Sequence, residues 1–205
     1  MCGIQGFFTP QKKEFTTAFT SDFRQALELI KYRGPDGEGL WSNSNVMLGH
    51  RRLSIIDLSS DGLQPMTKDG LTIIYNGEIY NYIELRAELD KLGVVTKTAT
   101  DTEVILNAYK TWGTDCFNRF NGMWAIAIWD ENRGELILSR DRFGVKPLYF
   151  SVLNDGLYFA SEMKQLLKIF ELSGKKADWN AGIVADFNER NLLHHSVETM
   201  YAEIF

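Results

Sequence analysis

Cysteine and histidine are both scarce in this chain of 205 residues. The two cysteines, Cys2 and Cys116, are too few for a disulfide framework, so the sequence predicts a reducing, cytoplasmic setting. The three histidines, His50, His194 and His195, do not stand at the spacing from a cysteine or a carboxylate that zinc sites use. We therefore predict that the chain holds no metal.

Long hydrophobic runs and an excess of positive charge are also missing. The longest uninterrupted apolar stretch, residues 123–129, is about a third of the roughly 20 residues that a membrane-spanning helix needs. The N-terminus has no basic segment of the secretory kind, and Pro10 ends the apolar run that starts at Ile4. The formal net charge of -5 gives no electrostatic reason to bind nucleic acid or an anionic membrane. We expect neither as a partner.

Short strand-like segments are frequent, and helix-like segments separate groups of them. Strands are expected at residues 2–8, 39–42, 46–50, 71–75, 123–130, 134–140, 148–152 and 157–160. Polar turns join the last four of these segments into two hairpins. Hairpins with helices inserted between groups of strands favour antiparallel sheets in an α+β protein.

Several segments carry the signals of helices. Helices are expected at residues 23–30, 81–92, 100–112, 162–168 and 180–191. Ser21 or Asp22 is expected to cap the first of them. Asn81 and Thr100 are each followed three residues later by a glutamate, which is the pattern of a helix N-terminus.

The segment 123–130 is apolar on both faces of its expected strand. One face carries Trp124, Ile126 and Ile128, and the other carries Met123, Ala125, Ala127 and Trp129. A strand covered on both faces suggests that one sheet packs on another, with the helices outside. We therefore predict an α+β fold, an αββα four-layer sandwich of two antiparallel sheets, in a single domain of residues 1–205.

Cys2 is informative because of its position. Excision of Met1, which is usual before a small residue, leaves Cys2 with a free α-amine. The amine has a reference pKa of about 7.7–8.0 and the thiol one of about 8.5, so one residue carries a base and a nucleophile suited to neutral pH. While Met1 is attached, the Cys2 nitrogen is a non-basic amide, and we expect Met1 to crowd the substrate space. For Cys116 we keep the ordinary interpretation of a small buried side chain.

The segment Asn76-Gly77-Glu78 directly follows the expected strand 71–75. Asn-Gly is a common hairpin turn, although here the chain continues into a helix instead of a returning strand. A side-chain amide next to a glycine N–H can also form an oxyanion hole. These residues alone leave both interpretations open.

Charged residues elsewhere also admit two interpretations. Arg52 stands before an apolar run, where an arginine either reaches solvent or pairs with an anion. Asp101 sits where a carboxylate complements a helix dipole, and Arg33 and Asp36 lie in a Gly-Pro loop where turn residues are usual. No phosphate-binding loop or dinucleotide fingerprint occurs, so we predict no ATP site in these residues.

Nine segments, in order along the chain, resemble the asparagine-synthetase type of glutamine amidotransferase, whose nucleophile is an N-terminal cysteine. They are MCGI (1–4), RGPD (33–36), HRRLSIID (50–57), QPM (64–66), NGEIYN (76–81), TDTE (100–103), GMWA (122–125), RDRFG (140–144) and ASEMK (160–164). Each segment alone is a weak signal, whereas nine in register across most of the chain are specific. The resemblance implies the αββα sandwich of the N-terminal nucleophile hydrolases, in agreement with the strand pattern.

The resemblance also implies a mechanism. The Cys2 thiolate attacks the side-chain carboxamide of L-glutamine, with its own α-amine as general base. The Asn76 side-chain amide and the Gly77 N–H hold the tetrahedral oxyanion. Catalytic roles therefore fall on Cys2, Asn76 and Gly77.

Further residues are implied to bind glutamine. Arg52 matches the residue that grips the α-carboxylate, a task suited to its fork of donors. Asp101 and Glu78 match the carboxylates that receive the α-ammonium. The remaining implied contacts with the substrate come from Leu53, Ser54, Ile55, Ile56, Asn76 and Gly77.

In this family a second domain uses ATP and Mg to activate a carboxylate that accepts the ammonia. The Ser-Gly-Gly-x-Asp-Ser motif of that domain is absent, and the chain ends at 201–205 without a stop signal. We therefore expect a glutaminase domain without its own cofactor, the N-terminal part of a longer two-domain synthetase. The identity of the carboxylate stays open, as does a homodimer.

Two other functions are compatible with the same fold. One is a stand-alone N-terminal nucleophile amidase on another amide, but Arg52 and Asp101 select a free amino acid. The other is an inactive binding or regulatory module, but Cys2, Asn76 and Gly77 are all retained. Ammonia and glutamate released from glutamine would support the glutaminase alone.

Overall fold

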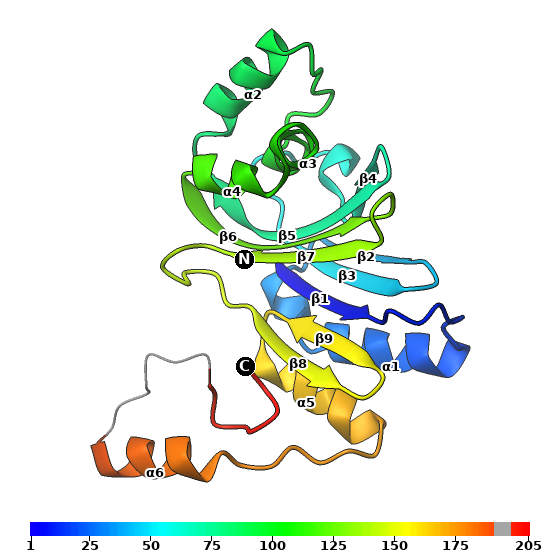
Figure 1. Cartoon of the computed structure of the whole chain (residues 1–205), viewed down its shortest axis with the longest axis vertical. Helices are drawn as coiled ribbons and strands as arrows, with labels where there is room; N and C mark the ends of the chain where they lie inside the picture. Colours follow the sequence, from blue (N-terminus) through cyan, green and yellow to red (C-terminus); the bar gives the residue numbers. More distant parts are fainter. Residues whose placement is uncertain (191–197) are drawn as a thin grey trace.

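The computed structural model describes residues 1–190 and 198–205 as two antiparallel sheets with helices outside them (Figure 1). The first sheet has the strand order β2 (Gly37–Ser42), β3 (Val46–Arg52), β1 (Gly3–Phe8), β9 (Gly156–Ala160) and β8 (Tyr149–Leu153). The second has the order β4 (Met66–Lys68), β5 (Leu71–Ile79), β6 (Gly122–Asp130) and β7 (Glu135–Arg140). His194 and His195, which entered the metal prediction, lie outside the described residues.

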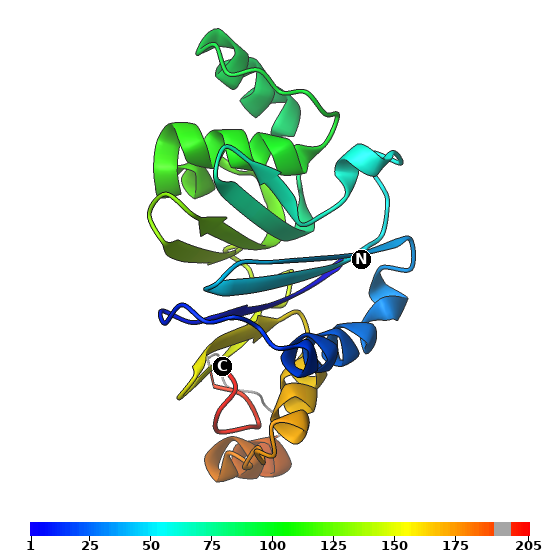
Figure 2. The ribbon, with the colours of Figure 1, turned by 90° about the vertical axis from the view of Figure 1, so that its right-hand side faces the viewer.

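Helices cover the outer face of each sheet, which gives the four layers seen in Figure 2. Against the first sheet lie α1 (Thr17–Glu28) and α5 (Met163–Leu172). Against the second lie α3 (Asp101–Trp112) and α4 (Cys116–Arg119), and α2 (Tyr82–Lys91) packs on α3. The remaining elements are α6 (Ala181–Arg190) and the short 3-10 helices η1 (Lys31–Arg33), η2 (Ser60–Gly62) and η3 (Gly113–Asp115). The predicted αββα sandwich is confirmed.

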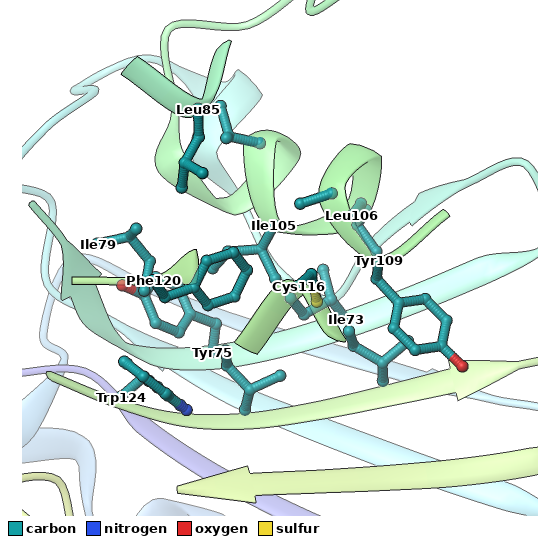
Figure 3. Close-up of a cluster of buried hydrophobic side chains, with 14 of the residues drawn as sticks. Ile73, Tyr75, Ile79, Leu85, Ile105, Leu106, Tyr109, Cys116, Phe120 and Trp124 are labelled. Atoms are coloured by element: carbon teal, nitrogen blue, oxygen red, sulfur yellow. The ribbon is translucent and has the colours of Figure 1, made fainter. Parts of the chain in front are cut away.

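The alternation of β6 explains why the two sheets stack. Its side chains divide between the core beneath α2–α4, with Trp124, Ile126 and Ile128, and the core between the sheets, with Ala125, Ala127 and Trp129. Figure 3 shows the first of these cores, with Cys116 inside it. Burial raises the pKa of the Cys116 thiol to about 12, which leaves it inert at neutral pH and confirms its structural interpretation.

Several predicted boundaries are wrong; helix α5, for example, continues to Leu172 instead of ending at residue 168. Helix α1 begins at Thr17 with Thr16 as its cap, because the Thr16 hydroxyl accepts a hydrogen bond from the Phe19 N–H at 3.1 Å. Strand β5 continues through Asn76–Gly77–Glu78 to Ile79 instead of ending at Tyr75, and it pairs with β6 along its whole length. The strand continues because glycine permits close contact with β6: a Cβ on Gly77 would stand 2.2 Å from the Met123 carbonyl oxygen.

Candidate active site

A pocket lies where the beginning of β1, the end of β3 and the second half of β5 meet. It has about 610 Å³ of space including its open mouth. Its lining comprises Met1, Cys2, Arg52, Leu53, Ile55, Ile56, Asp57, Gly62, Gln64, Tyr75, Asn76, Gly77, Glu78, Thr100, Asp101, Thr102 and Lys146. Every site residue predicted from the sequence except Ser54 is on this surface. The Ser54 N–H instead donates to Asp36 Oδ2 at 2.8 Å, outside the lining.

The Cys2 side chain contacts the backbone of the residue after β3. The Leu53 N–H donates to Cys2 Sγ at 3.3 Å, and Sγ lies 3.5 Å from the Leu53 carbonyl oxygen. Burial raises the pKa of the Cys2 thiol, although the Leu53 N–H, the N-terminal ammonium, Arg52 and Lys146 each lower it. A thiol in this environment needs a nearby base to become a nucleophile at neutral pH.

The backbone around Cys2 is held from the corner between β9 and α5. Arg33 Nε donates to the Cys2 carbonyl at 3.0 Å, and Arg33 Nη1 donates to Glu162 at 2.9 Å. Ser161 binds the backbone of Ile4, two residues after Cys2: its hydroxyl accepts from the Ile4 N–H at 2.9 Å, and its own N–H donates to the Ile4 carbonyl at 3.0 Å. These contacts fix the nucleophile from two sides.

No sequence motif predicted which groups fix Cys2. Arg33, Ser161 and Glu162 all belong to matched segments, but a segment does not reveal which distant residue it contacts. The sequence does contain one helix-start signal at this place, because Glu162 forms a capping box with Gln165 at the start of α5. That box places the first turn of α5 where the Glu162 side chain also reaches Arg33.

Asn76 presents an unsatisfied amide to the pocket. Its side chain is buried, and neither its Nδ2 nor its Oδ1 has a hydrogen-bond partner. A buried amide without a partner lowers stability by about 1–3 kcal/mol, and in a pocket its donors are free to bind a ligand. The adjacent Gly77 also lines the pocket, so a side-chain donor and a backbone N–H stand side by side there.

Asp101, the first residue of α3, is buried at the other end of the pocket. Its Oδ2 accepts hydrogen bonds from the Tyr75 hydroxyl at 3.0 Å and from the Ile79 N–H at 3.1 Å. Burial raises the pKa of this carboxyl despite both donors. Gln64 Oε1 in turn accepts from the Tyr75 N–H at 2.6 Å. Tyr75 and Gln64 were not predicted to line the site.

Arg52 organises the loop that follows β3. Its guanidinium donates to the Ser59 carbonyl at 2.7 Å and to the Asp57 carbonyl, and a Cβ on Gly62 would stand 2.3 Å from Nη2. The Arg52 side chain is buried, yet it lines the pocket. Arg52 therefore brings a positive charge to the site and fixes the loop that carries Leu53.

Met1 and Lys146 complete the lining near Cys2. The Lys146 ammonium lies 3.1 Å from Met1 Sδ, and Met1 lines the pocket; that Met1 crowds the glutamine site stays a prediction. Lys146 itself was missed, because it follows the matched segment 140–144 by two residues.

No group of three or more histidine, cysteine or carboxylate side chains within residues 1–190 and 198–205 gathers closely enough to hold a metal. Nor does any described helix have the length and hydrophobicity to cross a bilayer.

Comparisons with known proteins identify the family of this chain. The profile of the glutamine amidotransferase domain family matches residues 1–205. Asparagine synthetase [glutamine-hydrolyzing] 1 of Bacillus subtilis is 43% identical over 169 residues, 82% of this chain. Asparagine synthetase [glutamine-hydrolyzing] 3 of the same organism is 40% identical over 171 residues, also 82% of this chain. The chain spans 27% of the length of each of these relatives.

A solved structure shows the same fold at lower identity. Glutamine phosphoribosylpyrophosphate amidotransferase of B. subtilis superposes with a TM-score of 0.66 and 20% identity, over 85% of this chain and 44% of that one. The family profile covers the whole chain, and the two asparagine synthetases each match 82% of it. The chain belongs to the glutamine amidotransferase domain family.

Proposed function

We propose that this domain hydrolyses L-glutamine to L-glutamate and ammonia, with Cys2 as nucleophile after removal of Met1. The observation that carries the proposal is the unsatisfied Asn76 amide in the same pocket as the Cys2 thiol. The buried carboxylate of Asp101 and the guanidinium of Arg52 line that pocket too. A nucleophile, an oxyanion donor and two opposite charges for a free amino acid together fit a glutaminase.

The reaction follows from these groups. The α-amine of Cys2 takes the thiol proton, and Sγ forms a bond to the carboxamide carbon of glutamine. The negative charge moves to the carbonyl oxygen, where the Asn76 Nδ2–H and the Gly77 N–H donate hydrogen bonds to it. The amine returns its proton to the leaving nitrogen, and ammonia departs. Water then cleaves the γ-glutamyl thioester, which restores the thiol and releases glutamate.

Substrate selection is proposed to rest on charge. Arg52 binds the α-carboxylate of glutamine, while Asp101 and Glu78 bind its α-ammonium. The backbone at Leu53, Ile55 and Ile56 supplies the wall between them. Ser54 acts indirectly in this arrangement, because its N–H binds Asp36 and so fixes the loop.

The use of the ammonia is a further part of the proposal. The relatives named as asparagine synthetases are longer than this chain, which supports a synthetase domain in the same full-length protein. In that domain ATP and Mg would activate the acceptor carboxylate, and the glutaminase domain would need no cofactor of its own. We place the protein in the cytoplasm, and a homodimer is compatible with the proposal.

A glutaminase assay on two preparations tests the proposal. Intact mass distinguishes chains that retain Met1 from chains that begin at Cys2. We expect ammonia and glutamate in equal amounts from the processed chain and little or none from the unprocessed chain, since its Cys2 nitrogen is an amide. Hydrolysis of other amides but not of glutamine would favour the stand-alone amidase. Full activity in wholly unprocessed protein would overturn the role of the α-amine.

A further inference from the structure

Lys146 is a buried lysine whose ammonium points into the pocket beside the nucleophile. Its side chain is 4% exposed, and its Nζ lies 3.1 Å from Met1 Sδ. A thioether is a weak acceptor for an ammonium. Among the described residues no carboxylate lies within 4.0 Å of this nitrogen, although ion pairs are what usually accompany a buried lysine. Removal of Met1 takes away the sulfur contact, and the ammonium then lies in the pocket that Cys2 also lines.

The loop before Lys146 is held rigidly in a shape that delivers this side chain. The Asp141 carboxylate accepts hydrogen bonds from four backbone N–H groups, those of Trp124, Phe143, Val145 and Lys146. Arg140 donates to the carbonyls of Lys146, at 2.9 Å, and Gly144, at 2.8 Å. One buried charge, Asp141, and one exposed charge, Arg140, thus fix one short turn. A turn of this kind keeps the lysine in place at a cost in side-chain entropy that a surface lysine does not bear.

The charges around Lys146 and Cys2 come from every element that meets at the pocket. Positive charges are contributed by Arg33 and Arg52, and negative charges by Glu78 and Asp141. Burial lowers the pKa of Lys146, whereas the attraction of Glu78, Cys2 and Asp141 raises it and the repulsion of Arg33 lowers it. Lys146 is also among the groups that lower the pKa of the Cys2 thiol.

We propose that the Lys146 ammonium, which lies in the pocket that Cys2 also lines, stabilises the Cys2 thiolate and favours the neutral form of the α-amine. This inference rests on the proposed glutaminase function. A cation nearby favours the anionic form of the thiol and disfavours the cationic form of the amine. The first effect favours the thiolate that attacks glutamine, and the second keeps the resting α-amine in the neutral form that accepts the thiol proton. The catalytic pair therefore operates at a lower pH than it would alone.

The direct test is the pH dependence of Cys2 alkylation by iodoacetamide in processed protein, read by mass spectrometry without glutamine. Lys146→Met removes the charge but keeps an apolar stem, and Lys146→Arg keeps the charge. We expect Lys146→Met to move the alkylation profile of Cys2 to higher pH by about one pH unit or more, and Lys146→Arg to leave it close to wild type. Cys116 stays unlabelled in the folded protein because it is buried.

Glutaminase kinetics provide the second readout. In Lys146→Met we expect kcat/KM for glutamine to fall roughly 10- to 100-fold at pH 7 and to recover as the pH rises, because deprotonation then no longer needs the cation. A merely structural role would lower activity equally at all pH values. Lys110→Met is the matched control, since Lys110 pairs with Asp69 on the surface.

The outcomes separate this inference from the proposed function. An unchanged alkylation profile in folded Lys146→Met overturns the role of Lys146. The same shift in Lys146→Arg also overturns it, because charge would then be irrelevant. Absence of glutaminase activity in processed wild-type protein refutes the proposed function, while the alkylation profiles still decide what Lys146 does. A melting curve for each variant shows that the comparison is between folded proteins.

Discussion

The two ends of the pocket are built in different ways. The reaction end, with Cys2, Asn76 and Gly77, stands directly before β1, which pairs with β3 from Gly3 onward, and inside β5, where Asn76 and Gly77 pair with β6. The recognition end depends on Arg52 and the loop after it, which carries no strand until β4. Backbone ladders thus position the chemistry, whereas side-chain charges position the substrate.

This difference predicts how the two ends respond to substitution. At the reaction end a side chain can be removed while the ladder still holds the backbone, so activity is lost without loss of the fold. At the recognition end Arg52 both binds the substrate and donates to two loop carbonyls, so its removal changes affinity and loop order together. Four substitutions test the contrast, from the largest expected effect to the smallest.

Cys2→Ala removes the nucleophile and should have the largest effect. We expect ammonia release from glutamine to fall by on the order of 10⁴-fold or more, because no other group can form the thioester. The melting temperature should stay close to wild type, since the contacts that hold the Cys2 backbone do not involve its sulfur. Cys116→Ala is the control, with full activity per folded molecule and lower stability. Measurable hydrolysis by Cys2→Ala would remove Cys2 from its role.

Asn76→Ala removes one oxyanion donor from a paired strand. We expect a loss of about 2.7–4 kcal/mol of transition-state stabilisation, or roughly 10²–10³ in kcat, with KM little changed. Stability should not fall as it does for most buried polar deletions, because the Asn76 amide has no partner to lose. Steady-state kinetics and thermal melts measure both. A normal kcat with a raised KM would assign Asn76 to substrate binding.

Arg52→Ala should have the opposite kinetic signature. Loss of a charge-assisted contact with the α-carboxylate is expected to raise KM for glutamine roughly 10- to 100-fold. Because the Ser59 carbonyl also loses its donor, amide hydrogens of residues 53–63 should exchange faster. Arg119→Ala, an exposed arginine paired with Glu88, is the control. An unchanged KM would exclude Arg52 from the binding of glutamine.

Asp101→Asn should affect stability and affinity in opposite directions. Burial raises the pKa of Asp101, so the folded state holds that proton more tightly, and stability is lost as the pH rises through the folded pKa. Asparagine accepts the same bonds from Tyr75 and Ile79 without a charge, so we expect a higher melting temperature at pH 7 and a raised KM. The stability difference should vanish below about pH 3.9, where the unfolded carboxyl is also protonated. A difference independent of pH would contradict this explanation.

The layers of the fold follow from local sequence pattern. The two apolar faces of β6 and its hairpin with β7 predicted one sheet packed on another, and both are observed. The extent of β5 did not follow, because Asn76-Gly77 reads locally as a turn. Only the neighbouring strand β6, paired opposite Gly77, shows that the ladder continues.

The site followed from motifs, and its supporting contacts did not. Cys2, Asn76, Gly77, Arg52 and Asp101 line one pocket as the resemblance implied, although their roles stay predictions. The contact between Arg33 and Glu162 joins residues 129 apart in the chain. Local patterns carry no information on such pairs, since these depend on how β9 and α5 dock beside β1. The position of Lys146 in the pocket was not predicted for the same reason, because it too depends on contacts between residues distant in the sequence.

The placement of the nucleophile and the oxyanion donor on different sheets has a consequence for folding. Strand β1 pairs with β9 near the other end of the described chain, and Asn76 reaches Cys2 only once the second sheet has docked. Contacts between residues so distant in sequence form slowly compared with helices and hairpins. In a refolding experiment, far-ultraviolet circular dichroism should therefore recover before ammonia release does. The rate of glutamine hydrolysis then reports the final assembly of the sandwich.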